Sequence, residues 1–88
     1  MEVLNKIFKE FGIEREIEKD IELFDLGFDS IRIMELIILI EEELDIVIDD
    51  DDLVGENFET VETVIKLLEK YIWKKYHFRI YGILLLPF

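Results

Sequence analysis

The chain contains 88 residues, among them 22 acidic residues, ten basic residues and no cysteine, and its formal net charge is −12. This length suits one small domain, and an apolar fraction of 51% provides a core without disulfides or metal. The lack of cysteine excludes a disulfide scaffold, a thiolate zinc site and a cysteine nucleophile. The acidity argues against nucleic acid as a partner, since phosphates require a basic surface, and it favours a basic protein partner.

The charge is distributed unevenly along the chain. Residues 1–70 hold all 22 acidic residues and seven of the bases, whereas residues 71–88 hold three bases and no acid. The second segment also contains the only Trp, the only His, the only Pro and all three Tyr residues. We therefore divide the chain into one domain over residues 1–73 and an atypical basic and aromatic C-terminal tail over residues 74–88. Four interpretations of the tail stay open: a membrane-interface belt, a partner motif, an extension of the core, or non-native sequence.

The sequence carries no evident targeting or membrane-spanning segment. The N-terminus alternates apolar and charged residues, which is unlike a secretory signal peptide. The longest strictly apolar run, residues 83–88, is far shorter than the about 20 residues that a helix needs to cross a bilayer. We therefore expect a cytoplasmic monomer without a transmembrane segment.

The first predicted element is an amphipathic helix near the N-terminus. Gly12 ends it, and its apolar residues recur at helical spacing. These residues are Val3, Leu4, Ile7, Phe8 and Phe11. Residues 13–28 mix apolar anchors with acidic residues, so we expect a long loop with one helical turn in it and a sharp turn at Gly27.

A second helix is predicted from Ser30 to about Leu44, with the side chain of Asp29 as its N-cap. On a helical wheel at about 100° per residue, five apolar side chains cluster on one side and form the core face. They are Ile33, Leu36, Ile37, Ile40 and Leu44.

The opposite side of this helix also carries apolar residues. Ile31 and Ile38 lie nearly opposite the core face, beside Glu35 and Glu42. Met34 lies at the boundary between the two sides. An ordinary surface helix would show only polar residues there. Either the long loop or the tail covers this side, or it is a docking surface on which apolar contacts ringed by acids receive a basic partner.

The segment after the second helix is predicted to be irregular. Residues 45–52 contain too many acids for a buried strand, and we expect one short helical turn over residues 49–54 that ends at Gly55 and Asn57. Thr60 is the predicted N-cap of the last helix. The core stripe of that helix is Val61, Val64, Ile65, Leu68 and Ile72.

Together these elements predict an all-α fold. Three main helices and one short helix, with no strand pattern before residue 77, have to bury their apolar faces against one another. The expected architecture is a small antiparallel four-helix bundle with a long first loop.

Two kinds of chemical site are excluded by the spacing of their residues. A calcium-binding loop that starts at Asp50 would place Val54 and Val61 where the metal requires oxygen ligands. A serine hydrolase would need His and Asp partners around Ser30, and the only His, His77, lies in the tail. We therefore predict neither a specific metal site nor an enzyme.

Residues 25–31, Asp-Leu-Gly-Phe-Asp-Ser-Ile, resemble the modification motif of acyl carrier proteins. The likeness continues through residues 34–36, Met-Glu-Leu, and residues 40–46, Ile-Glu-Glu-Glu-Leu-Asp-Ile, which resemble the family's second helix and its exit. Residues 57–61, Asn-Phe-Glu-Thr-Val, resemble the entry to its last helix. The similarity spans roughly residues 3–73, and the combination of these segments at family spacing makes it specific.

The resemblance implies that Ser30 accepts 4′-phosphopantetheine from coenzyme A through a phosphopantetheinyl transferase. The thiol of this cofactor would then carry an acyl group as a thioester. Ser30 suits a phosphodiester physically, because free N–H groups and the dipole at a helix N-terminus favour anions. Asp29 belongs to the same attachment motif. Its carboxylate and the phosphodiester are both negative, so the benefit of Asp29 as an N-cap has to outweigh their repulsion. The alternative for the pair is a plain helix start.

The resemblance and the helical wheel agree on a partner face. Side chains of the second helix would dock on basic patches of the transferase and of the ligase or synthase enzymes that load the acyl group. The predicted docking residues are Ile31, Met34, Glu35, Ile38, Glu41 and Glu42. For the acidic run at residues 41–43, a solvated helix end is the alternative.

The function implied by the resemblance is that of an acyl carrier protein, which delivers acyl intermediates in fatty-acid, polyketide or related biosynthesis. Two residues depart from the pattern of fatty-acid carriers: Arg32 replaces a common acid, and Phe28 is bulkier than the residue often found before the motif's Asp. Carriers of peptide and polyketide pathways more often tolerate such residues. A peptidyl or aminoacyl carrier is therefore one alternative, and an unmodified acidic helical adaptor is another from a different class.

Overall fold

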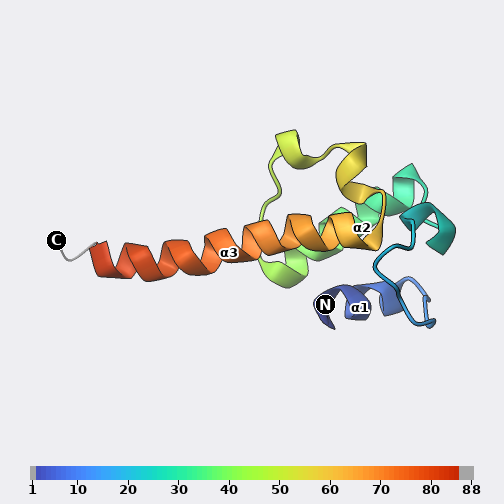
Figure 1. Ribbon diagram of the computed structural model, residues 1–88, viewed down its shortest axis with the longest axis horizontal. Helices are drawn as coiled ribbons and strands as arrows, with labels where there is room; N and C mark the ends of the chain where they lie inside the picture. The colour runs from blue at the N-terminus through green and yellow to red at the C-terminus, as the bar shows by residue number, and fades with distance from the viewer. Residues whose placement is uncertain (1, 86–88) are drawn as a thin grey trace.

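Three α-helices and three short 3-10 turns make up the fold (Figure 1). The structure is a computed structural model that describes the backbone of residues 2–85 and the side chains of residues 2–75. The α-helices are α1 (Glu2–Glu10), α2 (Ser30–Leu44) and α3 (Val61–Leu85), and the turns are η1 (Leu23–Leu26), η2 (Asp50–Asp52) and η3 (Gly55–Phe58). Residues 2–85 contain no strand, only an isolated β-bridge between Glu22 and Thr60. The predicted all-α fold with its long first loop is confirmed.

The helices differ in direction. α1 runs opposite to α2, whereas α3 runs in the same direction as α2 (Figure 1). Contacts with the end of α2 agree with this arrangement, since Lys6 in the middle of α1 pairs with Glu43 near the end of α2 at 3.2 Å. Lys75, far along α3, donates a hydrogen bond to the carbonyl of Leu44 at 2.9 Å. Residues 45–60 therefore have to lead the chain back to the other end of α2, and η2 and η3 lie in this return segment.

One apolar core joins all three α-helices and η1. Its most deeply enclosed side chains are Leu4, Ile7, Phe8, Leu23, Leu36, Ile40, Val64 and Leu68. Each such side chain stabilises the fold by about 1.5–3 kcal/mol relative to an exposed one. On α2, the predicted core face is only partly enclosed, because Leu36 and Ile40 are buried whereas its other three members are half-buried.

The buried side of α3 differs in part from the predicted stripe. Val61, Val64 and Leu68 are buried as predicted, but the remaining two members, at positions 65 and 72, are only half-buried. Leu67 and Tyr71 are buried in their place. The reason is that the return segment packs on a second side of α3, through η3 and through polar contacts with η2. An apolar pattern within α3 alone does not contain this information.

Both predicted N-caps are confirmed. Asp29 Oδ1 accepts a hydrogen bond from the N–H of Arg32 at 2.8 Å. At the start of α3, Thr60 Oγ1 accepts from the N–H of Thr63 at 3.2 Å, and Thr63 Oγ1 accepts from the N–H of Thr60 at 3.1 Å. These bonds satisfy N–H groups that lack a partner within their helix, and they explain why α2 and α3 begin where they do.

The return segment is more helical than expected. The predicted single turn over residues 49–54 is confined to η2, and Gly55 begins η3 rather than ending a turn. Gly55 is not among the glycines with positive φ, so its backbone does not interrupt a helical turn. The side-chain amide of Asn57 donates to the carbonyl of Asp52 at 2.8 Å, and this bond joins the two turns. The expectation that Gly55 and Asn57 end the helical segment was therefore wrong.

The helix α3 crosses the predicted boundary between residues 73 and 74 without a break in its backbone and extends beyond the other elements (Figure 1). The side chains of residues 76–88 and the backbone of residues 86–88 lie outside the described part of the chain. The division into a domain and a tail stays a prediction. Among residues 2–85, no helix combines the length and the apolar character needed to cross a membrane.

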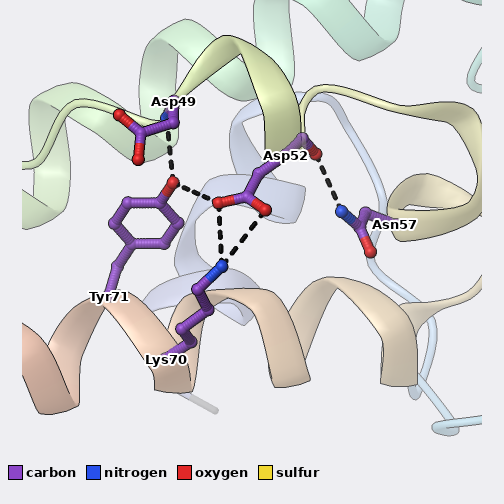
Figure 2. Close-up of polar contacts among 5 residues, drawn as sticks. All are labelled: Asp49, Asp52, Asn57, Lys70 and Tyr71. Atoms are coloured by element: carbon purple, nitrogen blue, oxygen red, sulfur yellow. Dashed lines mark hydrogen bonds and ion pairs between the residues drawn. The ribbon is translucent and has the colours of Figure 1, made fainter.

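A polar cluster ties η2 to α3 (Figure 2). The Tyr71 hydroxyl donates to Asp52 Oδ2 at 2.5 Å and accepts a hydrogen bond from the N–H of Asp49 at 2.8 Å. Lys70 Nζ lies 3.0 and 3.1 Å from the two carboxylate oxygens of Asp52. We call these four residues, Asp49, Asp52, Lys70 and Tyr71, the Asp52 clamp. It holds a turn that otherwise buries no side chain.

Within the Asp52 clamp, the pKa values of two groups shift in opposite directions. The hydrogen bond from Tyr71, followed by that from Lys70, lowers the pKa of Asp52 from its ordinary value of 3.8. Burial, and after it the hydrogen bond to Asp52, raises the pKa of Tyr71 to about 12. The carboxylate and the neutral phenol therefore coexist at every pH between these limits, and neutral pH leaves the clamp intact.

We expect alkaline pH to destabilise the protein through Tyr71. An unfolded tyrosine loses its proton near pH 10, whereas folded Tyr71 keeps it up to about pH 12, so the free energy of unfolding falls as pH rises between these values. Urea unfolding at a series of pH values measures this fall. Tyr71→Phe should be less stable at neutral pH by about 1–2 kcal/mol, the usual net contribution of the hydrogen bonds it loses. Above pH 10, however, its free energy of unfolding should change less with pH than that of wild type. If the free energies of unfolding of both proteins fell equally with pH above pH 10, Tyr71 would not be the cause of the fall.

Candidate functional site

The turn before α2 presents Ser30 at the surface. Gly27 has a φ of 92°, which lies in the left-handed region that glycine adopts without strain, and it reverses the chain. Phe28 is buried, with 3% of its surface exposed, and donates its N–H to the carbonyl of Leu23 at 3.0 Å. With Phe28 anchored in the core, Asp29 and Ser30 are left exposed at the amino end of α2.

The amino end of α2 suits a negatively charged group. The first turn of the helix contains no acidic residue, and the positive end of the helix dipole lies at Ser30. The carboxylate of Asp29 opposes an added anion by its charge, but it is oriented toward the N–H of Arg32. The Ser30 hydroxyl thus lies at a helix N-terminus, where backbone N–H groups can stabilise an anionic group.

A groove of about 420 Å³ opens beside Ser30, between α2 and the return segment. Its lining residues are Ser30, Ile33, Met34, Ile37 and Ile38 from α2, and Leu53, Val54, Gly55 and Phe58 from the return segment. Apart from the Ser30 hydroxyl, every side chain in this lining is apolar. The volume falls in the range typical of small-molecule sites, and the lining is suited to a hydrocarbon chain.

This groove was not predicted from the sequence. It explains why Ile33 and Ile37, which the helical wheel assigns to the core, are only half-buried. The available signal was the pair Leu53 and Val54, two apolar residues that follow four consecutive acids. In the sequence, such a pair is equally consistent with two side chains buried in the core. Only the position of the return segment over α2 makes the pair a wall of the groove.

The outer side of α2 is exposed, as the helical wheel indicates. Ile31 is 70% exposed, Met34 64% and Ile38 53%. Among the side chains that the structure describes, the long first loop does not cover these residues, so that alternative is excluded. Glu35 and Glu42 are exposed beside them. The described part of the molecule therefore presents apolar side chains among carboxylates on this side.

The acidic residues at the end of α2 are not equivalent. Glu41 is half-buried, and its carboxylate accepts a hydrogen bond from the N–H of Ile48 at 3.0 Å. Glu43 forms the ion pair with Lys6. Of the predicted docking acids, Glu35 and Glu42 are thus the more accessible, and Glu41 also fixes the start of the return segment.

In the part of the chain that the structure describes, no group of three or more His, Cys, Asp or Glu side chains is arranged to hold a metal ion. Within the acidic run of residues 49–52, the carboxylate of Asp52 is bound by Lys70 and Tyr71 instead.

Comparison with known families gives a match over most of the chain. A family model described as a phosphopantetheine attachment site matches residues 2–68. The matched segment contains α1, α2, the three turns and the first part of α3. Both walls of the groove and Ser30 lie within it.

Curated relatives carry the name acyl carrier protein. The protein of Bdellovibrio bacteriovorus is 48% identical over 46 residues, which are 52% of this chain and 56% of the relative. That of Clostridium perfringens is 44% identical over 50 residues, 57% of this chain and 63% of the relative. That of Exiguobacterium sibiricum is 42% identical over 45 residues, 51% of this chain and 54% of the relative. The chain thus aligns with little more than half the length of these relatives.

Proteins of this kind are carriers rather than enzymes, and their prosthetic group is phosphopantetheine. The family model matches well over half of the chain, and the relatives described above are all named acyl carrier protein. The chain therefore belongs to the acyl carrier protein family.

Proposed function

We propose that this protein carries acyl groups on a 4′-phosphopantetheine arm attached to the hydroxyl of Ser30. The observation that supports this most directly is the position of Ser30, exposed at the amino end of α2 and on the rim of an apolar groove. In the attachment step, a bond forms between Ser30 Oγ and the phosphorus of coenzyme A that bears the pantetheine. The diphosphate P–O bond between this phosphorus and the nucleotide part breaks, the nucleotide part leaves with its phosphate, and the hydroxyl proton passes to a base of the transferase.

The residues around Ser30 fit this prosthetic group. The helix N-terminus stabilises the charge of the phosphodiester. When bound, the group supplies the thiol that holds an acyl chain as a thioester, which the chain itself lacks because it contains no cysteine. The groove removes apolar surface of the acyl chain from water, which contributes about 0.8 kcal/mol for each buried methylene group.

The apolar groove favours one of the alternatives for the cargo. A charged aminoacyl group would find no polar side chain in the lining except Ser30. A fatty or polyketide chain places methylene groups against Ile33, Ile37 and Phe58. We therefore propose acyl intermediates of fatty-acid, polyketide or related biosynthesis as the cargo, rather than aminoacyl groups.

The outer side of α2 is the proposed docking surface for partner enzymes. The exposed residues Ile31, Met34 and Ile38 supply apolar contact, and Glu35 and Glu42 supply charge that attracts a basic patch. The partners proposed are a phosphopantetheinyl transferase and the ligase or synthase enzymes that load the acyl group.

Modification of Ser30 is tested by intact mass. After incubation with coenzyme A, Mg²⁺ and a broad-specificity transferase, the folded protein should gain the mass of one phosphopantetheine. Ser30→Ala should gain none and should keep the same circular dichroism. If the folded wild type gains no mass, the unmodified adaptor becomes the better interpretation.

The docking surface is tested by two substitutions on α2. Glu35→Lys and Ile31→Ala should slow phosphopantetheine transfer or subsequent acylation, because each removes a contact or a steering charge while leaving the core intact. Glu69→Lys makes the same charge change at an exposed position of α3 and serves as the control. Rates equal to that of wild type in both α2 variants, or a loss of helicity in either, would contradict a docking role.

The two roles of Asp29 are separated by two substitutions. Asp29→Ala removes the N-cap and should lower the free energy of unfolding by about 1 kcal/mol. Asp29→Asn keeps an N-cap of similar strength and removes the charge, so its stability should stay near that of wild type. If the transferase recognises the carboxylate, both variants should be modified slowly. Asp29→Asn modified at the wild-type rate would limit Asp29 to its structural role.

A further inference from the structure

One wall of the groove is an irregular segment with little packing of its own. Leu53 and Val54 connect η2 to η3, and together with Gly55, the first residue of η3, they face α2 across the groove. Leu53 is 39% exposed and Val54 40%, so neither side chain is anchored in the core. Polar bonds must therefore contribute much of what holds this wall in place.

Those bonds lie at both ends of the segment. On the η3 side, the backbone N–H of Asn57 donates to the carbonyl of Val54 at 3.0 Å, and its side chain donates to the carbonyl of Asp52. Phe58 then anchors η3 in the core with 5% of its surface exposed. On the η2 side, residues 49–52 reach another helix through the polar contacts of the Asp52 clamp (Figure 2). Just before them, Ile48 is buried in the core and donates its N–H to Glu41 of α2.

The clamp residues of α3 do not line the groove themselves. Lys70 and Tyr71 are absent from its lining and reach upward from α3 to η2, as Figure 2 shows. Tyr71 contacts the turn twice, at the N–H of Asp49 and at the carboxylate of Asp52. Any effect of these two residues on the groove is therefore transmitted through the return segment.

We infer that Lys70 and Tyr71 are positioning residues that set the length of acyl chain the groove holds. By fixing Asp49 and Asp52, they fix how far the segment 53–55 stands from α2. Loss of the clamp lets this wall move outward, so longer chains gain room and short chains lose contact. The inference rests on the proposed function, because it concerns the cargo of the same site.

The test compares acyl-chain-length profiles of the whole 88-residue chain. Wild type, Tyr71→Phe and Lys70→Met are loaded with butyryl-, octanoyl-, dodecanoyl- and hexadecanoyl-phosphopantetheine by the transferase from the matching acyl-coenzyme A. The gain in melting temperature over the unacylated phosphopantetheine form is measured for each chain. Wild type should show its greatest gain at one length. In both variants the greatest gain in melting temperature should occur with a longer chain than in wild type. The difference in this gain between the most and the least stabilising chain should shrink to roughly half of the wild-type difference or less.

A matched control separates positioning from general stability. Lys66→Met removes a lysine one turn earlier on α3, where its ion pair with Glu62 is exposed. This variant should keep the wild-type profile. If a clamp variant lowers the melting temperature by the same amount in the unacylated form and in every acylated form, the substituted residue has only a structural role. That result would overturn the inference.

The remaining outcomes distinguish the inference from the proposed function. If Ser30 is loaded and the clamp variants keep the wild-type maximum, the inference is wrong and the proposed function stands. If acyl chains of all lengths leave the melting temperature of wild type unchanged, the groove holds no chain and the inference is again wrong. If no mass is gained at Ser30, the proposed function itself fails.

Discussion

The arrangement of the site depends on α2 burying one side in the core while its other sides carry apolar residues as well. Leu36 and Ile40 are fully enclosed in the core shared with α1, η1 and α3, and their burial fixes the rotation of α2 about its axis. Helical geometry then turns Ile31 outward and places Ser30 and Ile37 along the groove. The packing of two side chains thus determines what the remaining surface of this helix can contact.

Features that depend on residues a few positions apart could be predicted from the sequence. The N-caps at Asp29 and Thr60 fix where two helices begin, and the glycine at position 27 marks the turn before α2. The position of Ile31 and Ile38 opposite the core face follows from a wheel of α2 alone, and the structure adds that both are exposed. The resemblance of residues 25–31 to a modification motif led to the family that the comparisons show. Each of these signals is contained within one or two turns of chain.

Features that depend on distant residues could not be predicted in the same way. Tyr71 belongs by composition to the aromatic C-terminal segment, yet it is buried and bonded to Asp52, nineteen residues earlier. The groove likewise requires the return segment to lie over α2, and no pattern in either segment specifies that placement. Glycine often ends a helical turn, but the φ of Gly55 is not positive, and the bond from the Asn57 side chain to the carbonyl of Asp52 joins η2 to η3 across it.

Met34 and Ile38 belong to two surfaces at once. Both line the groove, and both are exposed on the outer side of α2, so under the proposed function an acyl chain in the groove and an enzyme docked on the helix would contact the same side chains. Two ligands that share contacts in this way are linked thermodynamically, and each changes the affinity of the other by the same factor. Under the proposed function, cargo and partner binding would therefore be coupled through one helix. An enzyme that binds the loaded carrier more weakly than the unloaded one would also weaken the contacts of the acyl chain when it docks.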